Sequence, residues 1–284
     1  TGEACGYFAD YGRFDRRAPA RRQGFVYAGQ FSRVRRRAHG TFGADLPAAS
    51  FVVCTQNHDQ VGNRMLGERL AELTTFGQQK LAAGIVLLSP YLPLLFMGEE
   101  YGETAPFQYF TSFDDPELIE AVREGRREAF KGHRWEGELP DPQAEATFER
   151  SRLDHALRGQ GRHAVLQSFY TELIRLRQTV PALRRLDKQQ MEVTGFEREQ
   201  VLTWRRWHGA SEVAAAFNFS AEPQTLTLPL PRGAWCVLLD SEDARWQEPG
   251  SRAAEPAHGA IAGESSAHLT LAPQAFVLFA RCDD

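Results

Sequence analysis

Polar side chains that could carry out chemistry crowd together between Phe51 and Asn63. The four residues Phe51–Cys54 form a short apolar run without polar alternation, which is typical of a strand buried on both faces of a parallel sheet. The chain then turns polar over Gln56–Gln60, where His58 and Asp59 are adjacent. Functional residues of α/β folds gather where parallel strands end at their carboxyl side. We therefore expect a functional site at the end of this strand.

The tract QNHDQVGN, residues 56–63, resembles a signature motif of the α-amylase superfamily, glycoside hydrolase family 13. In that family a His-Asp pair closes the seventh strand of a (β/α)8 barrel. The alternative is structural: Asn57, His58 and Asp59 could cap the following turn and satisfy buried backbone groups there. The match extends over the whole tract and follows an apolar strand, as the motif requires, so the functional interpretation is favoured.

The resemblance implies cleavage of an α-glycosidic bond with retention of configuration. Such a reaction passes through an oxocarbenium-like cation held between two carboxyl groups roughly 5–5.5 Å apart. Asp59 would take a third role, as a fixed carboxylate that stabilises the cation. His58 would donate a hydrogen bond to hydroxyls of the same sugar. The resemblance places the rest of the motif in or beside the adjacent subsite: Gln60, Val61, Gly62 and Asn63.

The nucleophile and the general acid of this family lie on the fourth and fifth barrel strands, upstream of the His-Asp strand. No corresponding motif occurs in residues 1–50, and Glu3 does not follow the apolar strand that the acid role requires. The chain also begins with Thr1, already inside patterned sequence. We therefore expect the C-terminal portion of a longer enzyme, inactive without the N-terminal portion as its partner.

A helix must follow the His-Asp strand and return the chain to the far end of the barrel. Apolar residues near helical spacing predict this helix over residues 74–88, with Thr74 or Thr75 as its N-cap. Pro90 should end it, because the residue before a proline is pushed out of the helical region.

A second apolar run, residues 93–97, leads into Glu99 and Glu100. The order strand, helix, strand is a βαβ unit, and it would supply the seventh and eighth strands of the barrel. Both glutamates are candidates for the site because they follow a strand end. The alternative is a surface acidic pair at the start of a loop.

Residues 1–46 predict mostly loop, with one helix around residues 19–25. Flat aromatic faces suit the apolar faces of pyranose rings, so Tyr7, Phe8, Tyr11 and Tyr27 could line a sugar cleft, or they could pack locally. The segments GYFADYG and SRVRRRAHG are similar to segments of the trehalohydrolase branch of the superfamily. This similarity favours Tyr11 and one of Arg36 or Arg37 as substrate-binding residues.

The connection over residues 101–162 is long for a single βα loop and indicates a lid or specificity element. Its start, MGEEYGETAPFQYF, resembles the trehalohydrolase branch more closely than the glycogen branching enzymes. Residues 161–186 return to helical periodicity and predict the eighth barrel helix, which Pro181 disrupts.

Beyond Asp187 the period changes to short β-type runs separated by Gly, Pro, Ser and Asp, which predicts an antiparallel sandwich. The fold class is therefore α/β, the C-terminal part of a (β/α)8 barrel over residues 1–187, followed by an all-β sandwich domain over residues 188–284. His208, His258 and His268 lack metal-binding spacing. The predicted strands are residues 201–204, 213–219, 224–228, 235–239 and 275–279.

Composition describes an ordinary water-soluble protein, with 25% charged and 42% hydrophobic residues and a net charge of −4, so no nucleic-acid partner is favoured. Basic pairs such as Arg126–Arg127 are expected on a solvated face. Gly84, Ser89, Pro90 and Pro93 interrupt the longest apolar stretch, residues 82–97, which argues against a membrane helix. We see no secretory signal and expect a cytoplasmic protein whose four cysteines, Cys5, Cys54, Cys236 and Cys282, are free thiols.

The resemblance to the trehalohydrolase branch implies a glycosidase that cuts the α-1,4 bond next to the terminal trehalose of maltooligosyl trehalose and releases trehalose. The chemistry needs no cofactor and no metal. One alternative is a glycogen branching enzyme, which passes the glycosyl group to a sugar hydroxyl. Another is a carbohydrate-binding module without catalysis.

Overall fold

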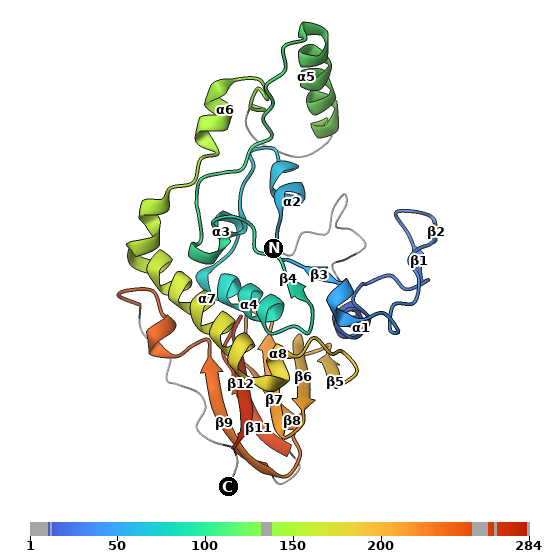
Figure 1. Ribbon diagram of the computed structural model, residues 1–284, viewed down its shortest axis with the longest axis vertical. Coiled ribbons are helices and arrows are strands. Elements are labelled where there is room, and N and C mark those ends of the chain that lie inside the picture. The colour runs from blue at the N-terminus through green and yellow to red at the C-terminus, as the bar shows by residue number, and fades with distance from the viewer. Residues whose placement is uncertain (1–10, 12, 132–137, 252–260, 264–265, 283–284) are drawn as a thin grey trace.

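The computed structural model describes residues 11, 13–131, 138–251, 261–263 and 266–282 (Figure 1). A six-stranded antiparallel sheet lies toward one end of the molecule, and the helices α4 (Phe76–Leu87) and α7 (Gly161–Thr179) lie next to it. The long connection between β4 and α7 forms the opposite end. Glu3, Cys5, Tyr7, Phe8 and His258, all discussed above, fall outside the described residues.

The predicted strand, helix and strand unit is present. Strand β3 (Val52–Val53) pairs in parallel with β4 (Leu92–Pro93), and α4 lies between them in sequence. Leu94 N donates to Val53 O at 2.8 Å, which extends the pairing by one residue. Two short helices fill the connection that follows β3: α2 (His58–Gly62) and α3 (Leu70–Leu73).

One expectation about these strands is wrong for the described part of the chain. The predicted strand at Phe51–Cys54 was expected to be buried on both faces, yet Val52 is 61% exposed. The reason is that β3 and β4 form a sheet of only two strands there, with no layer over the outer side chains. Leu92, Leu94 and Met97 are exposed as well, so this pair carries an open aliphatic face.

Helix α4 begins and ends as the sequence predicts. The Thr75 hydroxyl accepts from Gln78 N at 3.2 Å and the Gln78 side chain accepts from Thr75 N at 3.0 Å, which is a capping box. The helix packs closely on the sheet at Gly84, where an added Cβ would lie 2.5 Å from the Phe276 ring. A glycine is needed there because any side chain would push α4 off the sheet.

Helix α7 is the predicted long helix over residues 161–186, although it ends at Thr179 and a separate short helix, α8 (Pro181–Arg184), follows. Its apolar side is buried through Leu166, Phe169 and Leu173. The N-terminal helix is also found, as α1 (Arg17–Gln23), and a small hairpin follows it, formed by β1 (Phe31–Ser32) and β2 (Arg37–Ala38).

The C-terminal part has two β layers, as predicted. The large sheet has the order β10-β9-β12-β7-β6-β5, and β8 pairs with β11 in a second sheet. Alternate residues of β7 face opposite ways: Ala215 packs toward the helices and Ala216 toward the second sheet. The strands are β5 (Met191–Phe196), β6 (Val201–His208), β7 (Ser211–Asn218), β8 (Gln224–Pro229), β9 (Gly233–Asp240), β10 (Ile261–Gly263), β11 (Ser266–Leu271) and β12 (Phe276–Cys282).

The division into domains at Asp187 remains a prediction. One hydrophobic core includes residues from both sides of that boundary, such as Phe169 from α7 and Trp204 from β6. The helices that were expected to close the barrel therefore also form one layer over the β sheet.

The expectation of four free thiols is wrong for two of them. Cys236 and Cys282 form a disulfide between β9 and β12, which pair side by side with Cα atoms 5.8 Å apart at this bridge. No local sequence pattern predicts this disulfide, because the two cysteines are 46 residues apart and become neighbours through strand pairing. Cys54 is a free thiol.

The long connection between β4 and α7 contains two helices, α5 (Pro116–Phe130) and α6 (Glu145–Arg150). Asp115 caps α5 by accepting from Glu117 N at 2.9 Å. None of the residues of α5 is fully buried, so this helix rests on the body by one half-buried face. Within the described ranges, no helix combines the length and apolarity that crossing a membrane requires.

Three arginines converge on the C-terminal end of α4. Arg21 comes from α1, Arg177 from α7 and Arg206 from β6, and all three donate to backbone carbonyls around this helix end. A helix C-terminus carries partial negative charge and unpaired carbonyl groups, so guanidinium groups suit it. The acceptors are the carbonyl oxygens of Ile85 for Arg21, of Leu87, Ser89 and Tyr91 for Arg177, and of Leu88 for Arg206.

We predict that Arg177→Met lowers the free energy of unfolding by about 2 kcal/mol, because it leaves buried carbonyl oxygens at the end of α4 without donors. Arg175→Met is the matched control on the same helix, since Arg175 is exposed and bonds only Glu172 at 2.7 Å. Urea unfolding followed by circular dichroism measures both. Equal midpoints for the two variants would contradict the role given to Arg177.

Candidate active site

The His-Asp pair lies where expected, directly after β3 in the first turn of α2. Asn57 is the N-cap of this helix: its Oδ1 accepts from Asp59 N at 2.8 Å, and Gln60 Oε1 accepts from Asn57 N at 2.9 Å. The capping role that we considered as an alternative is thus present, and it engages Asn57 and Gln60. It leaves the side chains of His58 and Asp59 free of the cap.

The carboxylate of Asp59 faces outward from the described part of the chain. Its side chain is 70% exposed, and that of His58 is 72% exposed, with His58 Nε2 at 3.3 Å from Asp59 Oδ1. The backbone beneath them is fixed, because Asn63 Nδ2 donates to Asp59 O at 3.0 Å. Asp59 therefore has a defined position with an open side toward solvent.

Two other residues of the motif lie in the interior of the protein. Val61 and Gly62 are buried, and their predicted contact with substrate stays a prediction. A buried valine packs the helix against the body. Asn63 lies at the end of α2, where Arg126 of α5 reaches it with Nη1 at 3.5 Å and donates from Nη2 to Gly62 O at 3.2 Å.

Glu99, predicted as a carboxylate at the substrate, is buried with its oxygens engaged inside the chain. Oε1 accepts from Thr55 Oγ1 at 2.9 Å and from Tyr170 OH at 3.0 Å, and Oε2 accepts from Phe96 N at 3.3 Å. Burial raises the pKa of this carboxyl above its ordinary value, although these hydrogen bonds oppose the change. Glu99 therefore holds the segments that follow β3 and β4 to α7, and its contact with substrate stays a prediction.

Glu100 is half-buried and lies 3.6 Å from Arg158, which matches the alternative of a charged pair near the surface. Its predicted contact with substrate stays a prediction.

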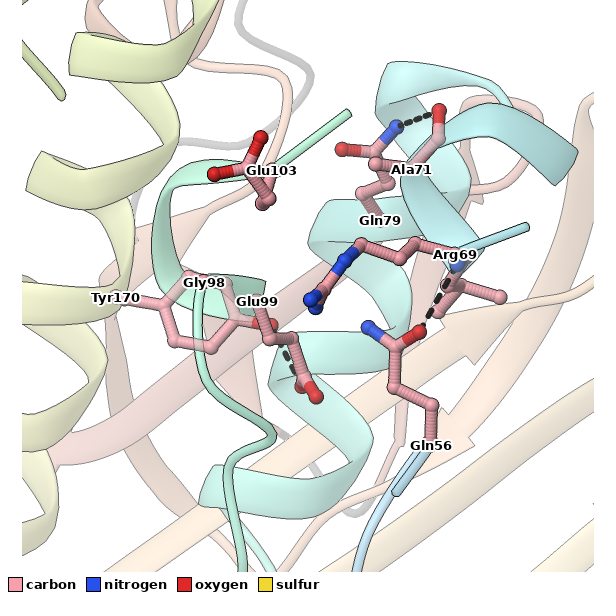
Figure 2. A pocket seen from close by; sticks show the side chains of 10 residues that line it. Gln56, Arg69, Ala71, Gln79, Gly98, Glu99, Glu103 and Tyr170 are labelled. Atoms are coloured by element: carbon pink, nitrogen blue, oxygen red, sulfur yellow. Dashed lines mark hydrogen bonds between the residues drawn. The ribbon is translucent and has the colours of Figure 1, made fainter. Parts of the chain in front are cut away.

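A small cavity lies beneath Glu99 (Figure 2). The volume of this cavity is about 10 Å³. That is room for about one water molecule and far too little for a sugar ring. Figure 2 shows Arg69 reaching into the middle of it, with Glu99 and Glu103 on one side. Residues that line it include Gln56, Arg69, Gln79, Glu99, Glu103 and Tyr170.

Arg69 is the residue of this cavity that the sequence analysis missed. It is 1% exposed, and it donates from Nε to Ala105 O at 2.6 Å and from Nη1 to Met97 O at 2.7 Å. Burial lowers its pKa. The isolated arginine carries no sequence signal, because its partners are backbone carbonyls 28 and 36 residues away.

Hydrogen bonds to the body of the protein also hold the segment before Asp59. Gln56 is buried, and its Oε1 accepts from Leu70 N at 2.9 Å, while Thr55 bonds Glu99. Residues on both sides of the His-Asp pair are thus held by the body of the protein. The arrangement can present one carboxylate and one imidazole rigidly on an open face.

The N-terminal candidates divide between packing and exposure. Tyr11 lies edge-on to Tyr27 at 5.8 Å, and Tyr27 is buried beneath Arg16, so local packing accounts for Tyr27. Arg36 and Arg37 are exposed in the hairpin of β1 and β2, which Figure 1 shows away from α2. The described structure does not bring these two arginines to Asp59, and their substrate contacts remain a prediction.

We predict that Glu99→Gln changes stability in a manner that depends on pH. Because the pKa of Glu99 is raised by folding, the folded protein binds more protons than the unfolded chain above about pH 4.5, and stability from this group falls as the pH rises through that window. The neutral amide lacks this loss. Unfolding free energies measured between pH 4 and pH 8 should therefore shift in favour of the variant as pH rises, whereas a constant difference would contradict the assignment.

Comparison with known proteins gives a consistent picture. The family model named "Domain of unknown function (DUF3459)" matches residues 197–278. A malto-oligosyltrehalose trehalohydrolase from Rhizobium sp. (strain M-11) is 42% identical over 86% of this chain and 40% of its own length. The same name belongs to proteins of Brevibacterium helvolum, 38% identical over 92% of this chain and 44% of the relative, and of Saccharolobus solfataricus, 45% identical over 62% and 30%.

A crystal structure from Salmonella typhimurium, described provisionally as an alpha amylase, superposes with a TM-score of 0.79 at 32% identity. It covers 99% of this chain and 44% of that one. The chain spans less than half the length of the relatives named here. The expected fold class, the C-terminal part of a (β/α)8 barrel followed by an all-β sandwich, is confirmed. The chain belongs to the α-amylase superfamily of glycoside hydrolases, in the group that resembles the malto-oligosyltrehalose trehalohydrolases.

Proposed function

We propose that this chain forms part of an enzyme that hydrolyses the α-1,4 bond next to the terminal trehalose of maltooligosyl trehalose and releases trehalose. The names of its relatives support this substrate, and each of the three relatives above is at least 38% identical to the chain. The reaction is a double displacement with retention, which needs neither a redox cofactor nor a metal.

The observation that carries the proposal is the placement of Asp59. Its carboxylate stands at the carboxyl end of β3, on a helix turn capped by Asn57 and anchored through Thr55 to Glu99. A carboxylate fixed in this way pays little reorganisation when positive charge develops on a sugar ring. His58, at 3.3 Å from it, would orient against the same ring by donating to a hydroxyl.

The two other carboxyl groups must come from polypeptide beyond this chain. We propose the N-terminal portion of the same enzyme as the partner that supplies the nucleophile and the general acid, roughly 5–5.5 Å apart. The open aliphatic face of β3 and β4 supports this assembly. Val52 and Leu92 stand exposed there, as expected where further barrel strands would pack.

A cytoplasmic location also belongs to the proposal. Reducing compartments keep most thiols reduced, so the disulfide between Cys236 and Cys282 offers a direct test. Alkylation of the protein in freshly lysed cells, followed by mass spectrometry, tests whether the two cysteines that are bridged in the structure stay reduced in the cell, as a cytoplasmic location requires. A fully bridged pair would count against this location.

We predict that Asp59→Asn, in the enzyme assembled from this chain and its N-terminal portion, lowers kcat by about 100-fold or more, because a neutral amide cannot stabilise the cation. Binding of maltooligosyl trehalose should change little, since size and hydrogen-bonding shape are conserved. Asp45→Asn is the matched control on an exposed loop. Trehalose release, measured by chromatography, is the assay.

Three outcomes of the same assay would sink the proposal. Full turnover by the variant would remove Asp59 from catalysis. Turnover by the isolated chain would show that no upstream carboxylates are needed. Branched glucan formed from amylose, with no trehalose from maltooligosyl trehalose, would instead indicate a glycogen branching enzyme.

A further inference from the structure

Four aromatic side chains stand exposed together in and beside the long connection that follows β4. We call Tyr109, Phe110, Phe113 and Phe148 the aromatic platform; their exposed fractions run from 36 to 46%. Exposed rings of this number on one segment are unusual, because isolated aromatic residues lower their free energy by burial. A surface that keeps them exposed indicates a ligand that covers them.

The platform is rooted in the core by a continuous series of rings. Phe96 is buried and lies 5.3 Å from Phe107, which lies 6.0 Å from Phe110, which in turn lies 5.3 Å from Phe148. Each pair meets edge to face, at interplanar angles of 70 to 83°. Such contacts fix the orientation of each ring, so the exposed faces are held ready for a ligand at little entropic cost.

The platform adjoins the proposed active site through Arg126. Its guanidinium lies 4.6 Å from the centre of the Tyr109 ring, and it donates to Gly62 O at the end of α2. Asp59 stands in the first turn of the same short helix. Arg126 thus links the platform to the helix that carries Asp59.

An ion pair and an amide side chain lie around the platform. Arg123 pairs with Asp141 by two hydrogen bonds of 2.7 and 2.9 Å, and Gln143 forms bonds with Thr111 and Phe113 through its amide. The charges of Arg123 and Asp141 cancel, and Arg126, stacked on Tyr109, adds a guanidinium that can donate to hydroxyl groups. A neutral ligand with many hydroxyl groups and apolar ring faces fits both the rings and this rim.

The composition of the platform separates it from the open face of β3 and β4. That face is aliphatic, as in Val52 and Leu94, and suits further strands of a barrel. The platform is aromatic, and flat rings match the flat apolar face of a pyranose.

We propose that the aromatic platform binds glucose units of an α-1,4-glucan chain, at a distance from the bond that is cut. The proposal rests on the proposed function and extends it, because it says where the malto-oligosyl part of the substrate lies. The chain would run from the platform past Arg126 toward α2.

The test is binding of maltoheptaose to the enzyme assembled from this chain and its N-terminal portion, measured by calorimetry and by ring-proton shifts in NMR. Phe110→Leu and Phe148→Leu keep an apolar side chain but remove the flat face, and each should weaken binding by about 10-fold. Phe42→Leu is the matched control, since Phe42 is also exposed but lies outside the platform. It should bind as the unchanged enzyme does.

Three results would overturn the proposal. They are no saturable binding by the unchanged enzyme, equal loss in Phe42→Leu, and weaker association of the platform variants with the N-terminal portion at unchanged affinity for maltoheptaose. The last would mean that protein covers the rings. Failure of the proposed function shows itself separately, as normal turnover by Asp59→Asn with binding at the platform intact.

Discussion

The structure depends on three guanidinium groups gathered at one helix end. Arg21, Arg177 and Arg206 all donate to carbonyl groups at or just beyond the C-terminus of α4. Burial lowers the pKa of Arg206 to about 9 and that of Arg21 to about 10, and repulsion from Arg177 acts in the same direction on both. The cluster is tolerated because the helix end offers partial negative charge and carbonyl oxygens that lack partners in the helix. It fixes α1, α7 and β6 to the point where β4 begins.

Helix α4 also helps to position the candidate active site. At its other end Gln79 Nε2 donates to Ala71 O at 3.2 Å, and Lys80 bonds Trp246 O at 3.1 Å, so α4 is held on both sides. From β4 the chain reaches Glu99, which holds Thr55 beside the His-Asp pair. The hydrogen bonds along this path are buried or part-buried, and the loss of one would leave a polar group unpaired, so displacements along the path are costly.

The sequence predicted those features that depend on local pattern. The motif after β3, the cap at Thr75, the helix from Gly161 and five of the C-terminal strands all carry their own apolar period or cap. Strands β5, β10 and β11 were not predicted. The disulfide, the role of Arg69 and the burial of Glu99 depend on partners far along the chain. No local pattern encodes them.

Glu99 and Asp59 show why environment, and not residue type, assigns roles to carboxylates. Glu99 is enclosed, and burial raises its pKa. Its oxygens accept hydrogen bonds from Thr55 and Tyr170, so its value lies in these contacts. Asp59 keeps 70% of its side chain in solvent, where the ionised form is well solvated. A sugar and the rest of a barrel would enclose this carboxylate and remove its water. Positive charge that develops on the sugar would then compensate for the lost solvation. In the reaction proposed above, an aspartate presented in this way would be most favourable when the bond breaks.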